Sequence, residues 1–457
     1  MKHGLFENKN KVFLFFLIFV ILLRISVLFF AYYYPERTLT NDSPSYLEPA
    51  RFLLRDHSYT YPSALRTPIY PLFLAGIYSF LGEYPLYVVL AQVVLGLLTI
   101  FLTYKISKEL FPEKNVLFGV FLLGFGLESI LSPFYLMTET LFTFFLVLMI
   151  LSFLQYKRSS KIYWMLACAG FSALAILCRP IALYFPVLIV FFFIWEHRSK
   201  IFQGIKISLV YLLVTIMLVT PWVVRNYYAL GLPVVSTITG DSLLFYSANA
   251  LLAQQKGIPF FASQEQLFEE FEQRVKQEGV PRTEKDLYNL KISMGKQILT
   301  QSPVLYLWVH IRDSFKVFLP GTASLNEMLG LPSNSIAFWD TLRTKNLFSA
   351  LRSYFDQTYG VQLLLLPFIA LLFATIWGAI VGSFVLIKDK SWFALSFLLL
   401  PILYLVFLSG PGAYSRFRVP IMPFLSILAG IGLMQIKTSW ARCIRMLDAR
   451  NLSRNQR

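Results

Sequence analysis

About ten apolar runs, each close to the length of a membrane-crossing helix, recur along the 457-residue chain. A helix of about 20 residues crosses the roughly 30 Å of hydrocarbon in a bilayer. Only 14% of the residues are charged, whereas about 25% is usual for a soluble domain. The sequence therefore predicts an all-α polytopic membrane protein with about ten transmembrane helices. The runs lie at 12–33, 85–104, 116–133, 139–156, 162–178, 181–195, 207–224, 361–387, 391–408 and 419–436.

The formal net charge of +16 is mainly a topology signal. About twenty Lys and Arg side chains fall at every second boundary between runs, from Lys2 to Arg457, and the positive-inside rule assigns such boundaries to the cytoplasm. Both termini are then cytoplasmic, and segment 225–360, whose charges nearly balance, is extracytoplasmic. The protein is expected in the cytoplasmic membrane, without nucleic-acid partners. The three cysteines form no disulfide framework and are interpreted as packing residues.

The chain divides into four parts by this topology. Residues 1–224 form an N-terminal membrane module with a first outer loop at 34–68. Residues 225–360 form an extracytoplasmic segment that is mainly helical, 361–436 the C-terminal membrane helices, and 437–457 a basic cytoplasmic tail. In the first outer loop, Ser43-Pro44 predicts a helix start followed by an apolar stripe, so a short interfacial helix is expected there.

Two carboxylates occupy the outer boundaries. Asp42 precedes the interfacial helix, where the positive end of the helix dipole favours an ionised carboxylate that can act as a general base. Glu139 opens the fourth run, where an ionisable group is costly unless it faces a cavity or a partner. Helix capping is the alternative interpretation for both positions.

Arginines accumulate on the same outer side, where the topology rule predicts fewer cations. Arginine is suited to hold phosphate oxygens with two hydrogen bonds, and the alternative is anchoring to lipid headgroups. The candidates are Arg66, Arg179, Arg225, Arg416 and Arg418. Arg24 is different: it lies near the middle of the first run, and we expect a structural side chain that pairs with a carboxylate or with backbone carbonyls. The chain has no phosphate-loop, HExxH or CxxC motif, so no cofactor is predicted and a divalent cation is not indicated.

These motifs, in this order, resemble the GT-C class of membrane glycosyltransferases that use polyprenyl-phosphate-linked sugars. The nearest groups are the bacterial relatives of the protein O-mannosyltransferases and the lipid A aminoarabinose and lipopolysaccharide galacturonosyl transferases. The resemblance is carried by Asn41-Asp42-Ser43-Pro44-Ser45-Tyr46, Arg66-Thr67-Pro68-Ile69-Tyr70-Pro71, Thr138-Glu139, Arg179-Pro180, Pro221-Trp222-Val223-Val224-Arg225-Asn226 and Ser415-Arg416-Phe417-Arg418-Val419-Pro420.

The resemblance implies that Asp42 is the catalytic base and that Arg416 or Arg418 holds the lipid-linked phosphate. Many members carry a second acidic residue after the first, where this chain has Ser43, and Glu139 is the candidate that remains. Arg179, Tyr46 and Tyr70 are further candidates from the same motifs.

The residues fit a sugar transfer to a hydroxyl acceptor on a lipid, a glycan or a protein. One base takes the acceptor proton, while Arg66, Arg225, Arg416 or Arg418 offsets the charge of the departing phosphate. In-line attack inverts the anomeric centre. A secondary transporter or flippase is the alternative, but its binding groups should lie near the bilayer midplane, where only Arg24 is found. A non-catalytic envelope protein is the third interpretation.

Overall fold

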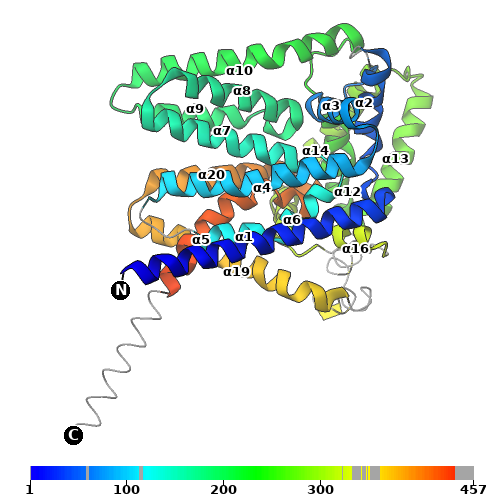
Figure 1. Ribbon diagram of the computed structural model, residues 1–457. Helices are drawn as coiled ribbons and strands as arrows, with labels where there is room; N and C mark the ends of the chain where they lie inside the picture. The colour runs from blue at the N-terminus through cyan, green and yellow to red at the C-terminus, as the bar shows by residue number, and fades with distance from the viewer. Residues whose placement is uncertain are drawn as a thin grey trace.

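Long helices lying side by side make up most of the molecule (Figure 1). The computed structural model describes residues 2–57, 61–112, 117–321, 323–331 and 361–437, with a few positions between 341 and 352; of 2–14, 17 and 361–364 only the backbone is described. No strand occurs among these residues. The basic tail predicted for 437–457 lies, after Lys437, outside the described residues, and so does Cys443.

Five helices are long and apolar enough to cross a membrane, and a bent pair makes a sixth. The pair is α5 (Leu117–Phe125) with Leu127–Phe134, which holds α6 (Leu127–Leu131) and η2 (Ser132–Phe134), and it bends by 62°. The five are α4 (Pro85–Leu110), α7 (Glu139–Ser159), α10 (Ile201–Leu230), α19 (Val361–Lys388) and α20 (Trp392–Ser409).

Shorter apolar helices account for the other predicted runs. They are Ile18–Tyr33 of α1 (Lys2–Tyr33), α8 (Ile162–Cys178), η3 (Pro180–Ala182) with α9 (Phe185–Glu196), and the last helix, Met422–Lys437. One more, α3 (Ile69–Leu81), covers a stretch that is too short to span a membrane on its own. All ten predicted runs therefore coincide with apolar helices, and the all-α polytopic fold class is confirmed.

Helix pairs in the bundle approach closely where glycine leaves room. α7 packs against α8 and α4, and α10 packs against α8 and α9. Between α19 and the last helix, a Cβ atom on Gly382 or Gly432 would overlap the backbone of the facing helix. Gly378 and Gly382 are spaced as in the GxxxG pattern of membrane helix contacts, which depends on small residues.

The helices between α10 and α19 gather at one end of the bundle (Figure 1), which we call the Asp42 end. The polar stretch 264–296 falls within two helices, α13 and α14, which are joined through a turn at Gly279, whose φ is +60°. A small core of their apolar faces and η4, separate from that of the bundle, packs around Leu267, Phe271 and Met294. The elements are α11 (Ile238–Asp241), η4 (Ser242–Ala248), α12 (Asn249–Lys256), α13 (Phe260–Gln277), α14 (Glu284–Gln301), α15 (Pro303–Ser314), η5 (Phe315–Phe318) and α16 (Ala323–Leu329).

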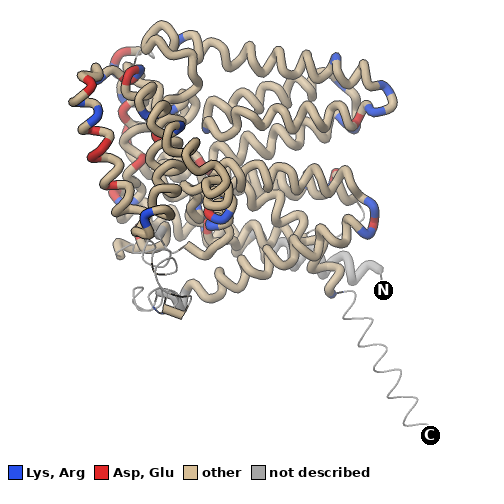
Figure 2. Tube along the Cα trace, turned by 180° about the vertical axis from the view of Figure 1, so that it is seen from behind, with Lys and Arg blue, Asp and Glu red and all other residues tan. Residues whose placement is uncertain are grey.

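Charge differs between the two ends of the bundle. At the Asp42 end, acidic and basic residues mix along α13 and its neighbours, whereas at the turns of the opposite end Lys and Arg outnumber Asp and Glu (Figure 2). α10 runs to Leu230, six residues past the predicted boundary at 224, so Arg225 lies within a helix rather than after it. Two short helices, η6 (Gly410–Gly412) and η7 (Ser415–Arg418), connect α20 to the last helix. They lie at the Asp42 end, since Arg416 of η7 contacts Asp42.

Candidate active site

Two arginines hold the carboxylate of Asp42, which lies between η1 (Pro35–Thr38) and α2 (Pro44–Asp56). Arg66 donates from Nη2 to Oδ1 at 2.9 Å, and Arg416 donates from Nη2 to Oδ2 at 2.8 Å. Arg66 comes from the same outer loop as Asp42, whereas Arg416 comes from η7, 374 residues after Asp42. The Asp42 side chain remains 34% exposed, so it is held by protein groups but still accessible.

The charge of these arginines controls the protonation of Asp42. Burial on its own would raise the pKa of Asp42, but the charges of Arg416 and Arg66 and their hydrogen bonds outweigh burial and lower it. Asp42 is therefore ionised at neutral pH. An ionised carboxylate can accept a proton, but one paired to two guanidinium groups is a weaker base than a free carboxylate.

Hydrogen bonds join the first outer loop to the second. The Ser43 hydroxyl accepts from the Thr40 amide at 2.9 Å and donates to the Leu136 carbonyl at 3.1 Å. Ser43 does occupy the N-cap position of α2, as predicted, but its side chain makes no capping hydrogen bond, because it bridges the loops instead. The predicted apolar stripe is also confirmed, since Tyr46, Leu47 and Ala50 are buried.

Glu139, the first residue of α7, belongs to the same cluster. Its Oε1 lies 2.7 Å from Nη1 of Arg179 and 3.8 Å from Nε of Arg416. Arg416 thus faces both carboxylates, from two different outer loops. Glu139 is 3% exposed, and its Oε2 is buried with no hydrogen-bond partner among the residues described. Thr138 accepts from Arg179 at 3.3 Å rather than capping α7, so the capping interpretation holds for neither carboxylate region.

Tyr46 and Tyr70 support Arg66, one of the two arginines that contact Asp42. The Arg66 guanidinium lies over the Tyr46 ring at 4.5 Å, and the ring of Tyr46 meets that of Tyr70 edge-on at 5.2 Å. The Tyr70 hydroxyl donates to Gln92 at 3.0 Å, and the Gln92 amide donates to the carbonyls of Pro133 and Tyr135. This chain of contacts fixes Arg66 against the second outer loop.

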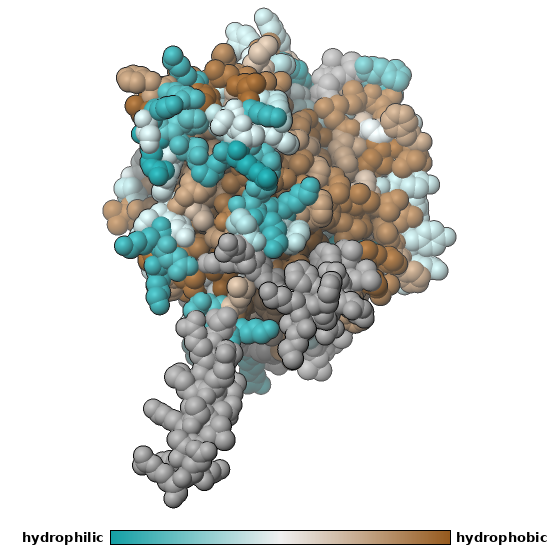
Figure 3. Space-filling view, turned by 60° about the vertical axis from the view of Figure 1, so that its left-hand side comes forward, coloured by the Kyte–Doolittle hydropathy of each residue, from teal (hydrophilic) through white to brown (hydrophobic). Residues whose placement is uncertain are grey.

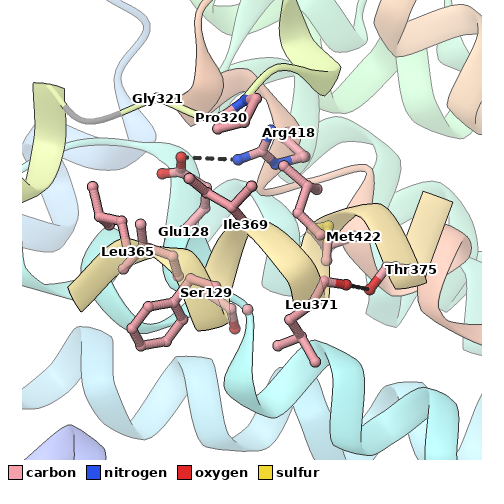
Figure 4. A pocket seen from close by; sticks show the side chains of 14 residues that line it. Glu128, Ser129, Pro320, Gly321, Leu365, Ile369, Leu371, Thr375, Arg418 and Met422 are labelled. Atoms are coloured by element: carbon pink, nitrogen blue, oxygen red, sulfur yellow. Dashed lines mark hydrogen bonds and ion pairs between the residues drawn. The ribbon is translucent and has the colours of Figure 1, made fainter. Parts of the chain in front are cut away.

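Arg225 and Arg418 have other partners. Arg225 donates to the carbonyls of Ser63 and Tyr61 and lies over Trp222 at 5.0 Å, so it fastens the end of the first outer loop to α10. Arg418 is 5% exposed and pairs with Glu128 at 3.0 Å (Figure 4). The structure therefore gathers Asp42, Glu139, Arg66, Arg179 and Arg416 into one cluster and places Arg225 and Arg418 in structural contacts.

A pocket opens beside this buried pair. It encloses about 490 Å³ of empty space, its open mouth included, and its walls are mostly apolar. Pro320 and Gly321 lie on one side, and Leu365 and Ile369 of α19 on another (Figure 4). The pocket adjoins η7, which carries Arg416.

Some site residues were missed in the sequence. Of these, Glu128 was the easiest to recognise as a candidate from the sequence, because it is an acidic residue inside an apolar run. Tyr246 of η4 lies near Asp42 and Arg416: burial and the Asp42 charge raise its pKa. Tyr246 reaches this position because η4 packs on η6, with the Tyr246 ring close to Gly412. The sequence around Tyr246 gives no sign of that contact. Within the described ranges, no group of three or more His, Cys, Asp and Glu side chains is arranged to hold a metal ion.

These features define a multi-pass helical membrane protein that holds paired carboxylates and arginines at one end of its bundle. The family model of the dolichyl-phosphate-mannose-protein mannosyltransferases matches residues 65–224, about a third of the chain. This match confirms the resemblance to the GT-C class of membrane glycosyltransferases. No curated protein matches the chain.

Several solved structures are distantly similar. The oligosaccharyltransferase AglB of Archaeoglobus fulgidus, in complex with an inhibitory peptide and a dolichol-phosphate, is 12% identical with a TM-score of 0.47, over 90% of this chain and 48% of its own. ArnT of Cupriavidus metallidurans bound to undecaprenyl phosphate is 13% identical with a TM-score of 0.39, over 93% of this chain and 76% of its own. The chain spans about half the length of the archaeal enzyme.

Proposed function

We propose that this protein is a glycosyltransferase that moves a sugar from a polyprenyl-phosphate donor to a hydroxyl acceptor at the outer face of the cell membrane. The observation that carries the proposal is that Arg416 faces two carboxylates from separate outer loops, at 2.8 Å from Asp42 and 3.8 Å from Glu139. A base and a phosphate-binding cation are thereby held in one cluster. The family match over residues 65–224, which include Arg66, Glu139 and Arg179, supports the same class.

Asp42 is the general base in this proposal. It takes the proton of the acceptor hydroxyl while the acceptor oxygen forms a bond to the anomeric carbon of the sugar. The bond from that carbon to the phosphate oxygen breaks, and the polyprenyl phosphate leaves with the electron pair. Attack from the side opposite the phosphate inverts the anomeric centre. No general acid is needed, because the phosphate is already a good leaving group.

Donor binding and base activation are coupled through the arginines. Arg416 and Arg66 hold Asp42 through one Nη2 atom each. A donor phosphate that enters the cluster competes for the same guanidinium groups, because arginine binds phosphate and carboxylate with the same geometry. As Asp42 loses these contacts, its pKa rises toward the ordinary value and it becomes a stronger base.

The first experiment measures binding of undecaprenyl phosphate, which needs no knowledge of the sugar. We expect Arg416→Gln to weaken binding about tenfold or more, since hydrogen bonds to charged groups contribute about 1.5–3 kcal/mol each. Arg274→Gln is the matched control, because Arg274 lies on α13 and pairs with Glu278 outside the cluster. Equal binding by wild type and Arg416→Gln would remove the phosphate role from Arg416.

The second experiment measures transfer from lipid-linked sugar donors to membrane extracts. Asp42→Asn keeps the shape of the side chain and removes the base, so we expect a loss of about 10²–10⁴-fold in the rate of transfer. Asp241→Asn, at the same end of the bundle and paired to Lys291 at 2.7 Å, is the control and should transfer normally. Transfer by Asp42→Asn at the wild-type rate would exclude Asp42 as the base. A flippase would instead move the donor lipid across vesicles without forming a new glycosidic bond.

A further inference from the structure

A large basic cleft lies at the end of the bundle opposite Asp42. It encloses about 1430 Å³ of empty space, its open mouth included, between the ends of α4, α7, α9 and α20. Four cations and two tryptophans line it together with apolar side chains: Lys157, Arg158, Arg198, Lys390, Trp195 and Trp392. None of these side chains belongs to the cluster around Asp42, and none is used in the proposed sugar transfer.

Two of the four cations already have acidic partners. Arg158 pairs with Glu109 at 3.0 Å, and Lys157 pairs with Glu196. The side chains of Arg198 and Lys390 are exposed and have no ion pair within the part of the chain that the structure describes. The cleft therefore presents two cations whose charge is not neutralised by these neighbours, which is a site for an anion rather than for a neutral molecule.

The cleft combines this charge with an aromatic and apolar wall. The ammonium group of Lys157 lies over the Phe393 ring at 4.5 Å, and Trp195 meets the same ring edge-on at 6.1 Å. Leu110 and Leu154 extend the apolar surface below the cations. Hydrophilic side chains stand directly beside hydrophobic surface at this end of the molecule (Figure 3). Tryptophan prefers the level of the lipid headgroups. The change from charged to aromatic to apolar side chains across the cleft therefore matches the change from headgroup to acyl chain along a lipid.

The length of α7 sets the depth of the cleft in the membrane. This helix begins at Glu139, in the Asp42 cluster, and reaches Lys157 and Arg158 in its last turn. Eighteen residues at a rise of about 1.5 Å each separate the two sites by roughly 27 Å, close to the roughly 30 Å thickness of the hydrocarbon core. The cleft is thus at the headgroup level of the other leaflet, where a donor phosphate in the Asp42 cluster does not reach.

We propose that this cleft binds the phosphodiester headgroup of an anionic membrane phospholipid, with Arg198 and Lys390 as its charge contacts. The headgroup phosphate lies between these two cations, the tryptophans flank the glycerol region, and an acyl chain follows the apolar surface of Leu110 and Phe393. Basic pockets between helices are a known way to retain anionic lipids. The bound lipid contacts both α9 and α20, whose ends also meet through the rings of Trp195 and Phe393.

Native mass spectrometry of the full chain in detergent tests the proposal, with phosphatidylglycerol and phosphatidylcholine of identical acyl chains as probes. We expect wild type to prefer phosphatidylglycerol about tenfold or more, since each cation near an anionic headgroup contributes about fivefold. Arg198→Gln/Lys390→Gln should lose that preference and keep the weak binding of phosphatidylcholine. The matched control is Lys200→Gln/Lys206→Gln, which removes the same charge from the same end of the bundle outside the cleft.

Four results would overturn the proposal. Wild type that binds both lipids equally has no headgroup site. An unchanged preference in the Arg198→Gln/Lys390→Gln variant places the site elsewhere, and an equal loss in the Lys200→Gln/Lys206→Gln control reduces the effect to overall charge. Displacement of phosphatidylglycerol by inorganic phosphate at the same concentration shows a site for the free anion instead of the lipid. Sugar transfer is not measured, so failure here leaves the proposed catalytic function untouched.

Discussion

Replacing Arg418 tests whether this arginine is structural, as its contacts indicate, or binds the donor. Its Nη2 pairs with Glu128 at 3.0 Å, and its Nη1 donates to the carbonyls of Val317 and Leu319 at 2.9 and 3.0 Å. Arg418 and Glu128 are each 5% exposed. Arg418→Met therefore leaves a buried carboxylate without its cation and two carbonyls without their donor.

The expected cost follows from this burial. Breaking a buried ion pair by removing one partner destabilises a protein by about 3–5 kcal/mol, because the remaining charge is uncompensated. Glu128→Leu/Arg418→Met removes that charge as well and replaces the pair with apolar groups. The two carbonyls are unpaired in both variants, at about 1–3 kcal/mol each, so their cost cancels in the comparison. We expect the double variant to be more stable than Arg418→Met by about 3–5 kcal/mol, the cost of the uncompensated charge.

Unfolding of the purified variants in detergent, followed by circular dichroism against temperature and denaturant, measures these differences. Arg416→Gln is the control, because its partner Asp42 is one-third exposed and such pairs contribute about 0–1 kcal/mol. A stable Arg418→Met protein, or a double variant whose loss equals the sum of the two single losses, would refute the structural role. Loss of undecaprenyl phosphate binding by a stably folded double variant would return Arg418 to the donor site.

The other predictions concern acid, helix packing and the first outer loop. The pKa of Asp42 is lower in the folded than in the unfolded protein. The ionised Asp42 carboxylate therefore stabilises the fold above about pH 4, and this stabilisation is lost as the pH falls through the pKa of the folded protein. The difference in melting temperature between wild type and Asp42→Asn should shrink below about pH 4. Gly382→Ala should lower the stability by about 1–3 kcal/mol through overpacking, whereas Gly170→Ala, with open space around the glycine, should not; thermal unfolding compares them. Arg225→Lys should increase proteolysis of the first outer loop, because Lys cannot donate to two carbonyls in the fork geometry of Arg.

Most of the fold was predictable because membrane helices leave a strong mark in a sequence. Ten apolar runs were identified, and each coincides with one or two apolar helices in the structure. The bend between α5 and α6 was not, since the run 116–133 reads as continuous; the helix breaks at Gly126, whose ψ of 128° is not helical. The end of α10 was also missed, because Arg225 and Asn226 resemble a polar boundary although they continue the helix to Leu230.

The site was predictable in its residue types more than in its pairings. Asp42, Glu139, Arg66, Arg179 and Arg416 were all candidates, because charged groups at an outer membrane boundary stand out against an apolar chain. Which arginine meets which carboxylate depends on the packing of η7 against the first two outer loops, which are hundreds of residues away. Sequence position made Arg416 and Arg418 equivalent, and the structure separates them.

The broken span between α5 and α6 explains why three charged residues, Arg24, Glu128 and Arg418, are buried near it. A break leaves backbone carbonyls without their helical donors, which is costly away from water. Arg24 answers this: it is 1% exposed, and it donates to the carbonyls of Gly124 and Ser129 at 3.2 and 3.5 Å. The same break turns Glu128 toward Arg418, and that ion pair anchors η7. Because Arg418 anchors η7, Arg416, two residues before Arg418, is held against Asp42. The cations of this chain thus differ in their contacts: Arg24 and Arg418 hold backbone carbonyls, whereas Arg416 contacts Asp42 and is the cation that we propose binds the donor phosphate.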